Sequence, residues 1–100
     1  FKMTLYRQGD VLIQEVEELP SHAYSRGGRL ILAFGQVTGH THEVHPRSGA
    51  KLYTYGAFLY LVVTDQLVRV EHPEHGTIEL PQGNYKVWQQ REFGLGTVRD

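Results

Sequence analysis

Histidine is the residue type whose number and spacing most clearly suggest chemistry in this sequence. Three of the six histidines lie within one short segment, at His40, His42 and His45, and a second pair follows at His72 and His75. Imidazole binds zinc, iron, copper and nickel well. The chain contains no cysteine, so a metal would have to be bound by imidazole nitrogens and carboxylate oxygens. The pattern predicts a divalent transition metal as cofactor.

The first histidine cluster lies at the end of a predicted strand. Residues 30–34 form a continuous apolar run, and residues 35–44 continue it with partial alternation, which predicts one long strand or two collinear strands. Alternate side chains of a strand point to the same face. We therefore expect His40 and His42 to point inward together, whereas His45 points outward or lies in the turn that follows.

The second cluster could complete the site. Residues 67–72 alternate between apolar and polar, so His72 should end an inward-facing row, and His75 follows in the next corner. We predict a metal site whose first-choice ligands are His40, His42 and His75, with His72 next. The carboxylates that could supply an oxygen ligand are Glu43, Glu74 and Glu92.

Two other interpretations of the histidines stay open. They could be acid–base groups or pH-responsive contacts without a metal, because the unperturbed pKa of histidine is about 6.5. They could also have no functional role, since single histidines in β-proteins are usually solvated or hydrogen-bonded. His22 stands alone in a predicted loop, and we assign it no role.

The polar end of the last predicted strand is a second candidate site. Arg91 could bind a carboxylate or phosphate through two parallel hydrogen bonds. Glu92, like Glu74, could act as a general acid or base. The competing interpretation is a solvated rim, which is what a charge run at a strand end usually forms.

Length and composition bound the class of protein. One hundred residues suffice for one domain with a modest core, which we place at residues 3–100, with Phe1 and Lys2 outside it. The formal charge is −1 and no basic block is present, so a nucleic-acid partner is not expected. No apolar run approaches the roughly twenty residues needed to cross a bilayer. We therefore expect no membrane association and a cytoplasmic protein.

Short apolar segments separated by turn-forming residues predict the fold. Chain reversals are expected near Gly9 and Gly56, and further turns at residues 65–66 and 81–84. No stretch of ten or more residues has a clear helical period of about 3.6 residues. About eight short strands without substantial helix indicate an all-β domain, as a small β-barrel or a two-sheet roll.

Two segments resemble the motifs of the cupin superfamily. Residues 39–42, Gly-His-Thr-His, resemble the opening of the first cupin motif, and residues 80–83, Leu-Pro-Gln-Gly, resemble the turn of the second. The resemblance implies a small β-barrel around a histidine-rich metal centre, often with iron, manganese, zinc or nickel. No histidine follows residues 80–83, where a cupin ligand is expected, so His72 and His75 would have to serve instead.

A second resemblance covers most of the chain. Several blocks look like those of a family of short bacterial and phage proteins that has no assigned activity. These blocks are residues 8–12, 38–42, 72–75, 80–85 and 89–93. The family's usual third block is His-Glu-Glu-His, and Pro73 replaces the first of these glutamates here. The resemblance points to the same histidines and implies no reaction.

These observations favour a small, cupin-like metal-binding protein. It would be a metal-dependent enzyme, such as a hydrolase, isomerase or oxygen-using enzyme, acting on a small-molecule ligand, although the sequence leaves open whether it is an enzyme. The alternative is a non-enzymatic oligomeric or phage-associated protein whose histidines cluster at a subunit interface. A homo-oligomer is expected because an outward-facing Trp88, with Tyr53, Tyr55 and Tyr60, would form an apolar patch.

Overall fold

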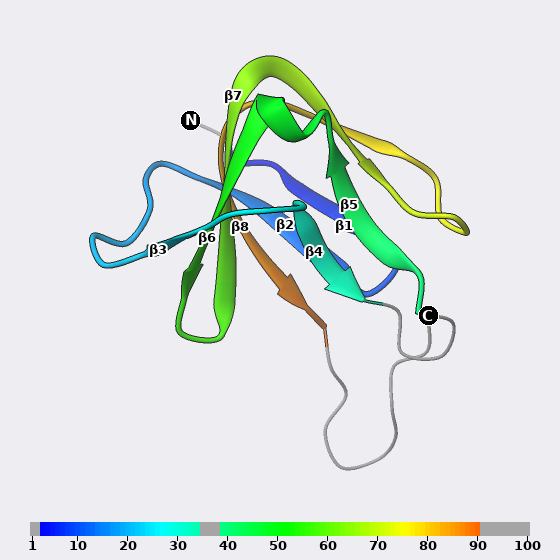
Figure 1. The fold of residues 1–100 in the computed structure, drawn as a ribbon, viewed down its shortest axis with the longest axis horizontal. Coiled ribbons are helices and arrows are strands. Elements are labelled where there is room, and N and C mark those ends of the chain that lie inside the picture. The colour runs from blue at the N-terminus through cyan, green and yellow to red at the C-terminus, as the bar shows by residue number, and fades with distance from the viewer. Residues whose placement is uncertain (1–2, 35–38, 91–100) are drawn as a thin grey trace.

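The computed structural model describes residues 3–34 and 39–90, which form one antiparallel sheet of eight strands (Figure 1). The strands are β1 (Leu5–Gln8), β2 (Val11–Val16), β3 (Tyr24–Arg26), β4 (Ile31–Phe34), β5 (Thr41–His45), β6 (Ala50–Tyr55), β7 (Phe58–Glu71) and β8 (Ile78–Gln89). One short 3₁₀ helix, η1 (Arg47–Gly49), joins β5 to β6. The predicted all-β fold with about eight strands and little helix is confirmed.

Strands β7 and β8 are the central strands of the sheet, and most other strands pair with one of them or follow from such a pair. Their order is β1-β2-β8-β7-β5-β4, while β6 pairs with β7 and carries β3 on its other edge. Figure 1 shows β7 bending over the molecule, with β6 and β5 to either side of the bend. Among the described strands the pairing does not close on itself, because β4, β3 and β1 remain edges. No helix in this part of the chain is long and apolar enough to span a bilayer.

Two of the predicted chain reversals are present as tight hairpins. Gln8 pairs with Val11 across a two-residue turn in which Gly9 has a φ of 58°. Tyr55 pairs with Phe58 across a similar turn, and Gly56 there has a φ of 61°. A positive φ at the first central position is the requirement of a type II′ turn, which glycine meets without steric cost. Local sequence therefore sets both hairpins.

The turns predicted at residues 65–66 and 81–84 are wrong. Both segments lie inside the continuous strands β7 and β8, at the point where the register between these strands shifts between Val63 and Leu67. Turn-forming residues can be accommodated in a bulge, which bends a paired strand without ending it. At this irregularity a side chain takes part in the pairing, because the Gln82 side chain donates a hydrogen bond to the backbone carbonyl of Thr64 at 3.3 Å.

The collinear arrangement predicted for residues 30–44 is also wrong. Strands β4 and β5 are antiparallel neighbours, with Ala33 opposite His42 and Phe34 opposite Thr41. Phe34 is 62 % exposed whereas His42 is fully buried, so the two residues do not share one continuous inward row. Periodicity reports which residues suit a strand, but it does not report whether the chain continues or reverses between two such segments.

The core lies on the inner face of the bent sheet. Its fully buried large side chains come from β2, β5, β7 and β8 and include Ile13, Val44, Leu61, Val70 and Tyr85. Tyr85 donates a hydrogen bond from its hydroxyl to the carbonyl of Pro81 at 2.6 Å. Burial raises the pKa of Tyr85 to about 12, with smaller contributions from Tyr6 and Glu15.

The aromatic patch expected around Trp88 is only partly present. Tyr60 is 7 % exposed and belongs to the interior, whereas Tyr55 is 43 % exposed. Trp88 is half-buried and contacts the Phe58 ring edge to face, with ring centroids 6.5 Å apart. The ammonium of Lys86 lies 3.9 Å from the centroid of the Phe58 ring. Trp88 is thus covered in part by its own neighbours.

Candidate metal centre

Four histidines from two separate segments lie together at one end of the inner face. The ring centroids of His42 and His72 are 4.3 Å apart, and those of His72 and His75 are 4.6 Å apart. The centroids of His40 and His72 are separated by 5.8 Å, and those of His42 and His75 by 5.9 Å. We call this group the histidine cluster. It contains all four residues that the sequence predicts as metal ligands.

Strand parity explains how two of these residues reach the interior. His42 follows the inward direction of Val44 on β5 and is fully buried. His72 lies just beyond the end of β7, continues the buried row of Val68 and Val70, and is 8 % exposed. His40 lies before the start of β5, so it is placed by the approach to the strand, where Gly39 has a φ of 74°.

The half-buried histidines are those nearest the solvent. The His40 side chain is 36 % exposed, and its Nδ1 atom lies 3.5 Å from Oε1 of Glu74. His75 is half-buried in the corner between β7 and β8. Glu74 is therefore the carboxylate among the predicted oxygen donors that the structure places beside the cluster. Its own side chain is 54 % exposed.

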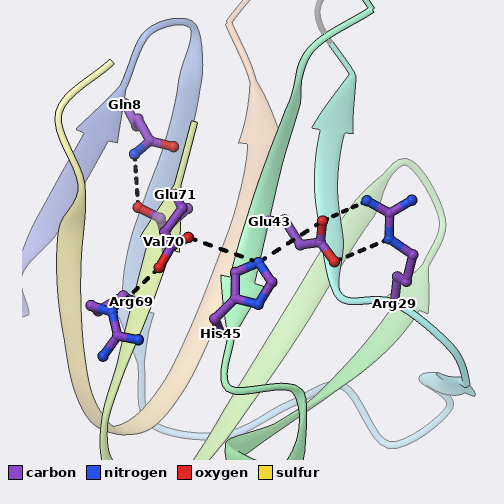
Figure 2. A network of polar contacts seen from close by, with 7 residues as sticks. All are labelled: Gln8, Arg29, Glu43, His45, Arg69, Val70 and Glu71. Atoms are coloured by element: carbon purple, nitrogen blue, oxygen red, sulfur yellow. Dashed lines mark hydrogen bonds and ion pairs between the residues drawn. The ribbon is translucent and has the colours of Figure 1, made fainter. Parts of the chain in front are cut away.

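Gln8 is a site residue that the sequence reasoning missed. It lies at the end of β1, is only 2 % exposed, and has its Oε1 atom 2.8 Å from Nδ1 of His42. Its Nε2 atom donates to the carbonyls of Val70 and Gly76, each at 2.9 Å. The first of these bonds is visible in Figure 2. Alternate residues of a strand point to the same face, and Tyr6, two positions before Gln8, packs against the core. This alternation was the available signal that Gln8 points inward.

Asp10 is a second buried polar residue near the end of β8. It is 4 % exposed, accepts a hydrogen bond from the Gln89 side chain at 3.0 Å, and accepts another at its backbone carbonyl from the Gln90 amide at 2.7 Å. The Arg7 guanidinium donates to the Gln90 side chain. These contacts hold the last described part of the chain against the β1–β2 turn. The predicted catalytic residues Arg91 and Glu92 lie outside the described residues.

Glu43 and His45, which the sequence analysis also considered, belong to a separate network of charged side chains on the outer face (Figure 2). Glu43 accepts two hydrogen bonds from the Arg29 guanidinium, at 2.7 and 3.1 Å. Nε2 of His45 lies 4.0 Å from a carboxylate oxygen of Glu43 and 4.0 Å from one of Glu71, and Glu71 also pairs with Arg69 at 3.3 Å. We call these five residues the outer ion network. His45 points outward, as parity predicts.

Glu43 is therefore not placed as an oxygen donor for the cluster. It has the opposite parity to His42 on β5, and its carboxylate is bound by Arg29. The hydrogen bond from Arg29 holds the pKa of Glu43 below its ordinary value, although partial burial opposes this shift. The same pairing raises the pKa of Arg29. The choice of Glu43 as a ligand is wrong because a nearer cation satisfies its charge on the other face.

The donor set of the cluster fits a transition metal chemically, while its geometry is incomplete in the described residues. Imidazole nitrogens are good ligands for zinc, iron, copper and nickel. Across residues 3–34 and 39–90, no group of three or more histidine, cysteine, aspartate or glutamate side chains has the spacing of a metal site. The rings are tilted against one another, by 37° for His42 and His72 and by 49° for His72 and His75. Coordination of one ion would require a side-chain adjustment that brings the imidazole nitrogens to metal-ligand spacing.

A cavity of about 500 Å³ opens beside β4. Its apolar wall includes Leu32, Ala33, Leu52 and Leu59, and Arg26 lies on its rim. Ala33 is the cross-strand partner of His42, but none of the four histidines of the cluster lines this cavity.

Comparison with known proteins supports a family assignment without an activity. Neither the curated proteins nor the solved structures include a match to this chain. A family defined by a domain of unknown function, DUF8820, matches residues 7–90, which include Gln8 and all four histidines of the cluster. The chain belongs to this family of domains of unknown function.

Proposed function

We propose that this domain binds one divalent transition-metal ion through the histidine cluster. The observation that carries the proposal is the convergence of four imidazole rings, from the start of β5 and from the corner after β7, on one largely buried position. Two of the four are at most 8 % exposed. Burying polar groups is costly unless hydrogen bonds or ligands compensate, so such a concentration of imidazoles in a small core favours a role in binding.

The proposal requires a modest rearrangement of side chains. A tetrahedral zinc ion with Zn–N distances of about 2.0–2.1 Å holds its ligand nitrogens about 3.3 Å apart. Four pairs of ring centroids in the cluster already lie between 4.3 and 5.9 Å apart, which is close to the separation expected for rings around one ion. His40 and His75 are half-buried, whereas His42 is fully buried and held in place by Gln8.

A metal-dependent reaction on a small molecule is the finer form of the proposal. Sites with three histidine ligands usually leave one position for water or substrate, where the metal acts as a Lewis acid. Glu74 lies beside His40 and would supply or accept a proton there. The sheet would then serve as a cupin-like roll around the centre.

The test measures metal stoichiometry and affinity on protein purified without an affinity tag. Elemental analysis and zinc titration calorimetry at neutral pH should give about one ion per chain, as expected for a single mononuclear site. The combined variant H40A/H42A/H75A should lose this binding. The matched control H22A/H45A also removes histidines but leaves the cluster intact, and it should bind as the wild type does.

Two outcomes would contradict the proposal. Absence of zinc, iron, manganese and nickel uptake by the wild type would leave the histidines without a metal. A stoichiometry well below one ion per chain, together with an oligomer in solution, would instead favour histidines from several chains meeting at a symmetry axis.

A further inference from the structure

We infer that Gln8 and the backbone amide of Glu74 impose opposite tautomers on His42 and His72, so that His42 binds the metal through Nε2 and His72 does not bind it. The tautomers follow from the hydrogen bonds of Gln8 and of the Glu74 amide, and they need no metal. The statement about ligands rests on the proposed function. Gln8 is thereby a positioning residue for the site.

The orientation of the Gln8 amide is set by its two partners on the backbone. The carbonyl oxygens of Val70 and Gly76 can only accept hydrogen bonds, and both lie 2.9 Å from the same terminal atom of Gln8. That atom must be the NH₂ nitrogen, because an oxygen there would face two other oxygens. Both amide hydrogens are thus used.

The Gln8 oxygen then decides the protonation of His42. Oε1 of Gln8 is an acceptor and lies 2.8 Å from Nδ1 of His42, so Nδ1 must carry the proton. In the neutral imidazole the lone pair then resides on Nε2. A partner that holds the second ring nitrogen in this way is the usual support of a metal-bound histidine.

His72 is held in the opposite state by the chain itself. The backbone N–H of Glu74 can only donate, and its nitrogen lies 3.0 Å from Nδ1 of His72. Nδ1 of His72 therefore carries the lone pair and Nε2 carries the proton. Binding a metal through Nε2 would require the ring to lose its only N–H proton or to move that proton to Nδ1. Both the move to Nδ1 and binding through Nδ1 itself would break the hydrogen bond from Glu74.

Because the tautomer of His72 excludes it as a ligand, His40, His42 and His75 form the ligand set. His72 contributes a hydrogen-bond donor at Nε2, and its ring packs between those of His42 and His75, at 4.3 and 4.6 Å. Gln8 also fixes the corner that carries His75, since Gly76 directly follows that residue. One buried amide therefore joins β1, β5 and the β7–β8 corner.

The first experiment is long-range ¹H–¹⁵N NMR of the imidazole rings in metal-free, ¹⁵N-labelled protein at a pH where the rings are neutral. We expect His42 with its proton on Nδ1 and His72 with its proton on Nε2. In Q8M, which keeps the side-chain length and removes the acceptor, His42 should shift toward the Nε2–H form. In Q8E, which retains an acceptor toward Nδ1 but loses the two hydrogen bonds donated to Val70 and Gly76, His42 should keep its proton on Nδ1. A wild-type His42 with its proton on Nε2 would overturn the inference.

The second experiment is zinc titration of the same variants. Q8M should bind zinc about 10- to 100-fold more weakly than the wild type, as loss of an outer-shell partner usually does, and Q8E should recover part of this loss. H42F should not bind zinc, whereas H72F should still bind it, more weakly than the wild type, because the His72 ring packs between those of His42 and His75 but supplies no ligand. Equal losses in H72F and H42F would overturn the ligand assignment. If the wild type binds no zinc but shows the expected tautomers, the proposed function fails while the role of Gln8 in setting the tautomer stands.

Discussion

Strand β5 carries two histidines three positions apart that the fold treats in opposite ways. His42 is fully buried and hydrogen-bonded to the neutral amide of Gln8. The side chain of His45 is 42 % exposed and lies 4.0 Å from carboxylate oxygens of Glu43 and Glu71. The same residue type thus contacts a neutral hydrogen-bond acceptor on the inner face and two carboxylates on the outer face.

The comparison shows how burial selects the kind of interaction. On the inner face, the amide of Gln8 and Nδ1 of His42 have defined partners, and a buried polar group that loses its partner costs about 1–3 kcal/mol. On the outer face, water screens the ion pairs, so their geometry can be looser and each contributes little. Directional bonds can set a tautomer, whereas screened charges cannot. This difference is why we place the functional site on the inner face.

The largest expected effect separates the two histidines directly. His42→Ala should weaken zinc binding by more than about 100-fold, because it removes a ligand together with the contact that orients it. His45→Ala should leave zinc affinity unchanged, since His45 belongs to the outer ion network. Calorimetric titration of both variants at neutral pH makes the comparison. Equal affinities in the two variants would remove the distinction between the faces.

The next effect concerns stability and the directed bonds of the inner face. Gln8→Leu should lower the free energy of unfolding by about 3 kcal/mol, because it leaves the carbonyls of Val70 and Gly76 and the Nδ1–H of His42 without their partner. Gln14→Leu is the matched control on β2, since the Gln14 side chain donates to exposed or half-buried carbonyls at 3.2 and 3.3 Å. It should cost less than about 1 kcal/mol. Urea denaturation measures both, and a similar loss in the two variants would contradict the argument.

The inner face should also resist the formation of charge at high pH. Burial raises the pKa of Tyr85 from 10.0 to about 12. Its contribution to stability is therefore complete below pH 10, and it is lost as the pH rises toward 12, because the unfolded chain releases the phenolic proton first. Over this range Tyr85 should account for a loss on the order of 2 kcal/mol in the wild type.

The variant Tyr85→Phe isolates this contribution. It removes the ionisable group and the hydrogen bond to Pro81, so it should be less stable than the wild type at pH 7 by about 1 kcal/mol. The difference should shrink or reverse between pH 10 and 12. Urea denaturation across this range provides the measurement, and parallel pH profiles for the two proteins would show that Tyr85 ionises at its ordinary pKa.

The smallest effect is expected on the outer face at acid pH. Arg29 holds the pKa of Glu43 below its ordinary value of 4.5. The resulting contribution to stability is present above that value and is lost as the pH falls through the lowered pKa. In Arg29→Met the pKa of Glu43 should rise toward 4.5, and NMR titration of its carboxyl carbon measures the shift. Arg69 pairs with Glu71 and not with Glu43, so the control variant Arg69→Met should leave the pKa of Glu43 unchanged.

Much of the fold could be predicted from the sequence because it depends on local chemistry. Gly9 and Gly56 supply the positive φ that their hairpin turns require. The alternation of side chains placed His42 and His72 inside and His45 outside, and the structure agrees with each of these positions. Strand alternation is a property of neighbouring residues, so it can be followed along the chain without knowledge of distant contacts.

Only the tertiary structure decided how these segments meet. Residues 65–66 and 81–84 have the composition of turns, yet the pairing of β7 with β8 carries them through as a bulge. Strands β4 and β5 pair side by side, although periodicity predicted one long strand or two collinear strands. Gln8 reads locally as part of a polar corner, and its partners Val70 and Gly76 are 62 and 68 positions away. Local alternation could indicate that Gln8 points inward, but it could not identify His42 or these carbonyls as its partners, because hydrogen bonds between distant strands depend on the register that folding sets.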